Sequence, residues 1–181
     1  MFSLLGRIVA FSRLSRNAEL QKAIEPALET YLQGLNDSSP EIRQEVLARL
    51  DAIPIRRADI ALALIKYLER SDQPDEDRQA AVTALAAQAV FADSTPGLHD
   101  VLKPGVAVLA GALNSPETRV RDAAVRALGH IGSEARSAEE TLRRLARNDP
   151  HPTIRKEAED AIKAINGIAK MPPPPSPGRR M

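Results

Sequence analysis

The chain has 181 residues, enough to bury a hydrophobic core without disulfides or metal ions. It contains no cysteine, which excludes disulfide frameworks, thiolate metal sites and cysteine nucleophiles. Lys and Arg number 25 against 24 Asp and Glu, so the net charge of +1 lacks the basic excess of a dedicated nucleic-acid binder. Only five residues are aromatic, whereas 29 are alanine, a composition that favours packed helices over sheets.

The first 16 residues form a segment of their own, which combines apolar side chains with three arginines and no acid. Arg7 interrupts the apolar run, which argues against a secretory signal. We interpret residues 1–16 as a tail or capping segment, with a targeting segment and a membrane-surface anchor as open alternatives. No run of about 18 apolar residues occurs, so integral membrane insertion is disfavoured and a cytoplasmic protein is expected.

One arginine returns in the same context four times, as Arg43, Arg78, Arg121 and Arg155. The intervals are 35, 43 and 34 residues, and the middle one contains an insertion at residues 92–105. A turn with Asn, Asp or Ser and with proline precedes each arginine, as expected at the start of a helix. Apolar residues three and seven positions after each arginine lie on one helical face. Each arginine therefore marks the start of an amphipathic helix.

A second apolar segment precedes each turn, so each unit reads as helix, turn, helix. Neither helix of such a pair buries its apolar stripe alone, and the units must therefore stack. We predict an all-α fold, a right-handed α-solenoid of about four such units within residues 17–166. Residues 167–181 contain four consecutive prolines and are predicted to form a disordered tail.

The segments RVRDAAVRALGHIGSEA and LRRLARNDPHPTIRKEAEDAI resemble tandem HEAT-like repeats, in particular the short repeats first described in phycobilin lyases. This resemblance implies a ladder of hydrogen-bonded Asp and Arg residues between neighbouring repeats. Carried onto this chain, the ladder comprises Asp37, Arg43, Asp72, Arg78, Arg121, Asp149 and Arg155. Ser115 stands where the pattern has aspartate, and Asp77 stands where the other units have Ile or Val. We therefore expect a weaker ladder at the third repeat and an irregular second repeat.

The sequence offers no reactive constellation. His99, His130 and His151 lack the spacing of metal ligands, and the glycine-rich phosphate loops and serine elbows of common enzymes are missing. We therefore expect no enzyme activity, no cofactor and no metal site.

The candidate binding surface is the side of the second helices opposite their apolar stripe. It is expected to form the concave side of the solenoid, and it is polar, of mixed sign and without aromatic residues. The candidates for partner contact are Gln44, Gln79, Asp122, Arg126, Lys156 and Asp160. Such a surface disfavours nucleic acid and favours another protein as the partner. Asp122 and Arg126 are both expected to be exposed.

We therefore predict a non-enzymatic protein-protein interaction module or scaffold. The repeat type leaves chromophore handling as one alternative. Because Arg outnumbers Lys by 19 to 6, phosphate or nucleic-acid binding stays open as another.

The insertion at residues 92–105 has two open interpretations, recognition or packing. Leu98, Val101 and Leu102 are expected to dock a short turn on the neighbouring core. Deletion of Thr95 to Asp100 is expected to spare the fold.

Overall fold

The computed structural model describes residues 28–52, 57–70, 72–90 and 97–168. Within these ranges all regular structure is helical. Residues 28–33 are helical. The elements that follow are η2 (Gly34–Asn36), α3 (Pro40–Ala52), α4 (Ala58–Glu69), α5 (Asp75–Ala89), α6 (Leu98–Leu102), η4 (Lys103–Gly105), α7 (Val106–Ala112), α8 (Thr118–Ile131), η5 (Gly132–Ala138), α9 (Glu139–Asn148) and α10 (Pro152–Ile165).

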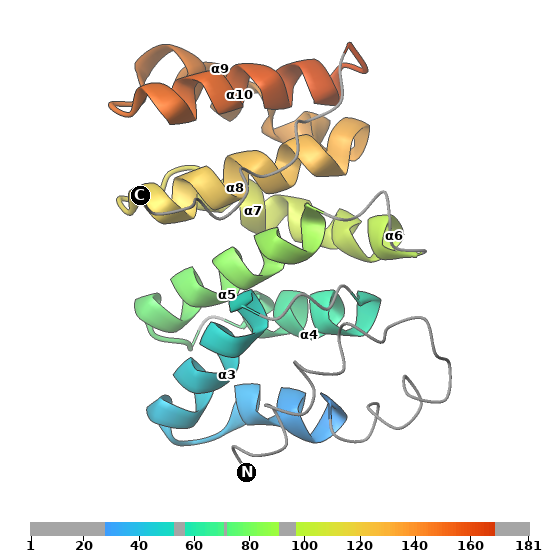
Figure 1. The fold of residues 1–181 in the computed structure, drawn as a ribbon, viewed down its shortest axis with the longest axis vertical. Helices are drawn as coiled ribbons and strands as arrows, with labels where there is room; N and C mark the ends of the chain where they lie inside the picture. Colours follow the sequence, from blue (N-terminus) through green and yellow to red (C-terminus); the bar gives the residue numbers. More distant parts are fainter. Residues whose placement is uncertain (1–27, 53–56, 71, 91–96, 169–181) are drawn as a thin grey trace, which may run out of the picture.

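The helices stack in chain order along the long axis of the molecule (Figure 1). The second helices of the units form a row in which α3 packs against α5, α5 against α8 and α8 against α10. Each also packs against a first helix of its own unit, α5 against α4, α8 against α7 and α10 against α9. The predicted all-α solenoid of helical hairpins is therefore confirmed.

Helix α8 shows how the sequence produces this packing. Val120, Ala124, Leu128 and Ile131 are all buried, and their spacing of four, four and three residues places them on one face. The helix ends at Gly132, whose φ of 72° lies in the left-handed region that favours glycine. The same spacing recurs in the other second helices, so one apolar core runs from the first described helix to α10.

The described part of the insertion is a packing element. Leu98 and Leu102 of α6 are fully buried, Val101 is half-buried, and α6 packs against α4. Gly105 is also buried, and a Cβ there would lie 3.2 Å from Cδ1 of Ile65. The burial of Leu98 argues against the expectation that deletion of Thr95 to Asp100 spares the fold, because the deletion would remove a fully buried side chain. Residues 92–96 lie outside the described residues.

The terminal segments lie largely outside the described residues. The predicted capping segment at 1–16 and the proline-rich run after Ile168 are not described. In the part of the chain that is described, no helix is long and apolar enough to cross a membrane.

Candidate functional site

The turns that precede α3, α8 and α10 share one geometry. In each, the side chain six residues before the arginine accepts a hydrogen bond from the backbone N–H two residues further on. The pairs are Asp37 with Ser39 at 2.8 Å, Ser115 with Glu117 at 3.2 Å and Asp149 with His151 at 2.9 Å. The second unit differs because Pro74, which has no N–H, occupies the donor position. There the side-chain amide of Gln73 instead donates to the carbonyl of Tyr67.

The four repeating arginines each fasten the start of their helix to the preceding turn. In every case Nη1 donates to backbone carbonyl oxygens of that turn or of the helix end before it. The shortest of these bonds are Arg43 to Asp37 at 2.9 Å, Arg78 to Arg70 at 2.8 Å, Arg121 to Pro116 at 2.9 Å and Arg155 to Asp149 at 2.6 Å. This bond lies within a unit, so Nε and Nη2 remain available for the next unit.

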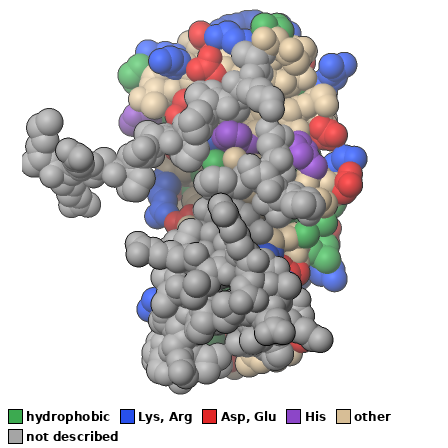
Figure 2. Space-filling view, turned by 45° about the vertical axis from the view of Figure 1, so that its right-hand side comes forward, with side chains coloured by type: hydrophobic (Ala, Val, Ile, Leu, Met, Phe, Trp, Pro, Cys, Tyr) green, Lys and Arg blue, Asp and Glu red, His purple; other side chains and the backbone are tan. Residues whose placement is uncertain are grey.

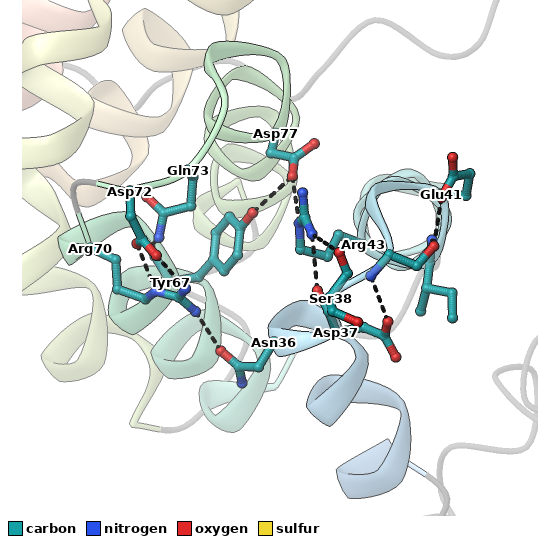
Figure 3. Close-up of polar contacts among 12 residues, drawn as sticks. Asn36, Asp37, Ser38, Glu41, Arg43, Tyr67, Arg70, Asp72, Gln73 and Asp77 are labelled. Atoms are coloured by element: carbon teal, nitrogen blue, oxygen red, sulfur yellow. Dashed lines mark hydrogen bonds and ion pairs between the residues drawn. The ribbon is translucent and has the colours of Figure 1, made fainter.

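Between the first and second units, Nε of Arg43 donates to Oδ2 of Asp77 at 2.8 Å (Figure 3). The hydroxyl of Tyr67 donates to the same oxygen at 3.2 Å. Asp77 is fully buried, and among the described residues its Oδ1 has no hydrogen-bond partner. The ladder acid of the second unit is therefore Asp77.

The expectation that Asp72 fills this ladder position is wrong. Asp72 lies on the exposed edge of the turn and pairs with Arg70 at 2.9 Å, while Nη1 of Arg70 also donates to Asn36 of the first unit at 2.8 Å. Asp77, from the first turn of α5, lies between Arg43 and Tyr67 (Figure 3). The altered turn at Pro74 and the altered acid therefore occur in the same unit.

Between the third and fourth units, Arg121 binds Asp149 with two hydrogen bonds. Nε lies 2.8 Å from Oδ2, and Nη2 lies 3.3 Å from Oδ1. The side chains of Arg121 and Asp149 are only 10% and 1% exposed. Burial by itself raises the pKa of Asp149, but the hydrogen bonds from Arg121 and from the N–H of His151 hold that pKa below its ordinary value. This junction is closed by a buried, fully hydrogen-bonded ion pair.

Between the second and third units the corresponding pair is missing from the described residues. None of them places a carboxylate within ion-pair distance of Arg78, and Ser115 stands at the position that Asp149 has in the next turn. The hydroxyl of Ser115 accepts the N–H of Glu117. The described ladder therefore has pairs at the first and last junctions and an interruption at the middle one.

The six residues predicted for partner contact all lie on the second helices, α3, α5, α8 and α10. Gln44 and Lys156 are exposed, whereas Gln79, Asp122, Arg126 and Asp160 are half-buried. Asp160 accepts a hydrogen bond from Lys163 at 3.0 Å. Over the described surface visible in Figure 2, basic and acidic side chains are likewise interspersed.

Arg126 is not the exposed charge that the sequence suggested. Its Nη1 donates to Oε1 of Glu157 in α10 at 3.0 Å, and these two side chains are 12% and 17% exposed. Burial, and then the nearby carboxylate of Asp122, raise the pKa of Glu157 to about 7, while Arg126 acts in the opposite direction. Reversal of Arg126 would therefore disturb a contact between helices as well as the surface.

One ion pair that sequence reasoning missed joins two helices of this face. Nη2 of Arg119 in α8 lies 2.5 Å from Oδ2 of Asp51 in α3. These helices flank α5 in the row, so their side chains meet across α5, as expected where the row curves inward. Asp51 follows Gln44 by seven residues, and Arg119 precedes Arg126 by seven, so the pair lies on the predicted stripe. The seven-residue spacing was present in the sequence, but the pairing of residues 68 positions apart was not.

Within the described residues, no group of three or more His, Asp or Glu side chains is arranged to hold a metal ion.

A family model described as HEAT repeats matches residues 61–163, more than half of the chain. The match runs from α4 to α10 and so covers the second, third and fourth units. The fold and the match define a helical-repeat protein, and the chain belongs to the HEAT-repeat family. HEAT repeats generally mediate protein-protein interaction, and proteins built from them are typically non-enzymatic scaffolds. None of the curated proteins matches the sequence.

Proposed function

We propose that the chain is a non-enzymatic scaffold that binds another protein on the face formed by α3, α5, α8 and α10. The ion pair between Asp51 and Arg119 carries this proposal, because it joins two helices across a third and so indicates a face that curves inward. An inward-curving row of helices offers an extended surface to an elongated partner. The six predicted residues lie along this row.

The charge pattern of this face supports a polar partner. Asp51, Arg126 and Asp160 are already paired within the chain. Gln44 and Lys156 are exposed, and among the described residues no side-chain hydrogen bond or ion pair holds either of them. A polar helix or an extended peptide with charges of both signs is complementary to such a surface, whereas a lipid is not.

The test uses two variants that change the net charge equally on opposite sides of the solenoid. The tagged full chain captures a partner from the source cell, and mass spectrometry identifies it. Lys156→Glu on the proposed face is expected to lower the affinity for that partner about tenfold at low salt, because an attractive charge becomes repulsive. The matched control, Arg147→Glu on the first-helix side, is expected to leave the affinity unchanged. Both residues are exposed, so both melting temperatures should stay near that of the parent. An equal effect of both variants, or none, contradicts the proposed face.

The two alternatives stay predictions from the sequence, each with its own measurement. Chromophore handling predicts a change in absorbance when the protein is mixed with a linear tetrapyrrole. Phosphate or nucleic-acid binding predicts retardation of a nucleic acid that weakens steeply with salt.

A further inference from the structure

A groove of about 560 Å³ lies where the described ladder is interrupted. Its walls come from α5, from α7 and from the turn before α8. Val82, Val108 and Ala112 contribute apolar side chains, while Arg78 and Ser115 contribute polar groups. Gln79 also lines it, so the groove adjoins the face proposed for partner binding.

The guanidinium of Arg78 is fixed on one side only. Its Nη1 is held by the carbonyls of Arg70 at 2.8 Å and Leu68 at 3.3 Å, and by the side chain of Gln73 at 3.2 Å. Among the described residues, its Nε and Nη2 have no hydrogen-bond acceptor. These donors form the edge that binds a carboxylate in Arg43 and in Arg121.

We infer that the groove beside Arg78 is a docking site for an aspartate or glutamate side chain of a partner polypeptide. That carboxylate takes the place at Arg78 that Asp77 takes at Arg43 and Asp149 takes at Arg121. The apolar wall of α5 and α7 accommodates a small apolar residue next to the acid. The inference rests on the proposed function only in that the chain binds proteins, because the groove lies beside the second-helix face.

Two features of the groove favour a carboxylate over a phosphate. The planar edge of a guanidinium matches the two oxygens of a carboxylate, and the chain itself binds a carboxylate on this edge at two equivalent positions, through Nε alone in Arg43 and through both Nε and Nη2 in Arg121. Asp75 also lines the groove, and its charge opposes a multiply charged phosphate more than a singly charged carboxylate. The occupant is therefore an acidic side chain, and the local field around Arg78 and Asp75 selects a single negative charge.

The experiment uses the variant Ser115→Asp, which supplies the missing carboxylate at Arg78 from the chain itself. An aspartate at position 115 should accept the N–H of Glu117, as Asp149 accepts that of His151, and should place its carboxylate at Arg78. The matched control is Ser115→Asn, which has nearly the same shape and also accepts the Glu117 N–H but carries no charge. A displayed library of random dodecapeptides is selected against the parent full chain. Dissociation constants of the selected peptides are then measured for the parent, Ser115→Asp and Ser115→Asn.

The inference predicts that the selected peptides share an Asp or Glu beside a small apolar residue. They should bind Ser115→Asp about tenfold more weakly or worse, and Ser115→Asn within about twofold of the parent. Replacing the shared acid of the peptide by its amide should lower the affinity for the parent about tenfold and should change the affinity for Ser115→Asp little. The melting temperature of Ser115→Asp should equal or exceed that of the parent, because the internal pair is restored. Should that variant fold poorly, Arg78→Lys provides the same test. Lysine keeps the positive charge but lacks the planar pair of donors that binds both oxygens of a carboxylate, so the selected peptides should again bind more weakly.

Peptides without a shared acid, or peptides that bind Ser115→Asp as tightly as the parent, would overturn the inference. In that case binding at the second-helix face still stands on the response of the captured partner to Lys156→Glu. Failure to select any peptide also counts against the groove. If the affinity for the captured partner is also unchanged by Lys156→Glu, the proposed face is contradicted independently of the groove.

Discussion

The junction between the third and fourth units and the junction between the second and third are built on the same helix packing but differ in their polar contacts. At the former, Arg121 pairs with Asp149 and Arg126 pairs with Glu157. At the latter, Arg78 has no described carboxylate partner and a groove lies beside it. The apolar stripes of α5, α8 and α10 stack at both junctions. Apolar burial therefore stacks the units at both junctions, whereas among the described residues the Arg–Asp ladder pair is present at only one of the two.

The largest effect is expected from the paired junction. Arg121→Ala leaves the almost fully buried carboxylate of Asp149 without its cation, so the free energy of unfolding should fall by about 3 kcal/mol. Urea unfolding followed by circular dichroism measures this change. The control is the double variant Arg121→Ala with Asp149→Ala, which should lose less than the sum of the single losses because no charge is stranded. Strictly additive losses would show that the two residues do not act as a pair.

A smaller effect is expected at the interrupted junction. Arg78→Ala removes hydrogen bonds to carbonyl oxygens and to Gln73 but strands no described carboxylate, so the loss should be about 1 kcal/mol. The same urea series measures it. If Arg78→Ala destabilises as much as Arg121→Ala, the two junctions do not differ in their ion pairing.

An effect of similar size is a pH dependence that arises at the paired junction. The pKa of Glu157 is raised to about 7 from its ordinary value near 4.5, so the folded chain binds a proton more readily than the unfolded chain. Through this group, stability should therefore fall as the pH rises from about 4.5 to about 7 and level off above. With solvent screening of the partly exposed group, the change should be about 1 kcal/mol.

The control for this pH dependence is Glu157→Gln, which cannot titrate but can still accept a hydrogen bond from Arg126. Melting curves of parent and variant between pH 5 and pH 8 test it. The difference between parent and variant should vary with pH over that range, and a constant difference would contradict the role given to Glu157.

Much of the fold could be predicted because the repeated arginine and its apolar stripe are local signals. The helix starts at Pro40 and Pro152 follow from turn chemistry, and the burial of Val46, Leu128 and Ile165 follows from helical spacing. For the insertion, the sequence left recognition and packing open, because its proline and glycine residues are typical of a loop. The expected docking of Leu98 and Leu102 on the neighbouring core is confirmed, since that core provides an apolar surface for them.

The candidate site was predictable in composition but less so in detail. Helical projection identified a polar face of mixed sign, and the exposed positions of Gln44 and Lys156 agree with it. It failed for Arg126, because a single-helix projection contains no neighbour that could cover the side chain, whereas Glu157 of α10 covers it in the stack.

The sequence by itself determined the repeat, the helix starts, the apolar stripe and the turn chemistry, because each depends on residues within a few positions of one another. Only the tertiary structure decided which acid meets which arginine. Asp77 rather than Asp72 reaches Arg43, and Arg119 meets Asp51 across α5, because these contacts depend on distances between stacked units. Residues 34 and 68 positions apart have no local signal that sets those distances. The place where a partner's acid would complete the ladder at Arg78 is set by the same stacking.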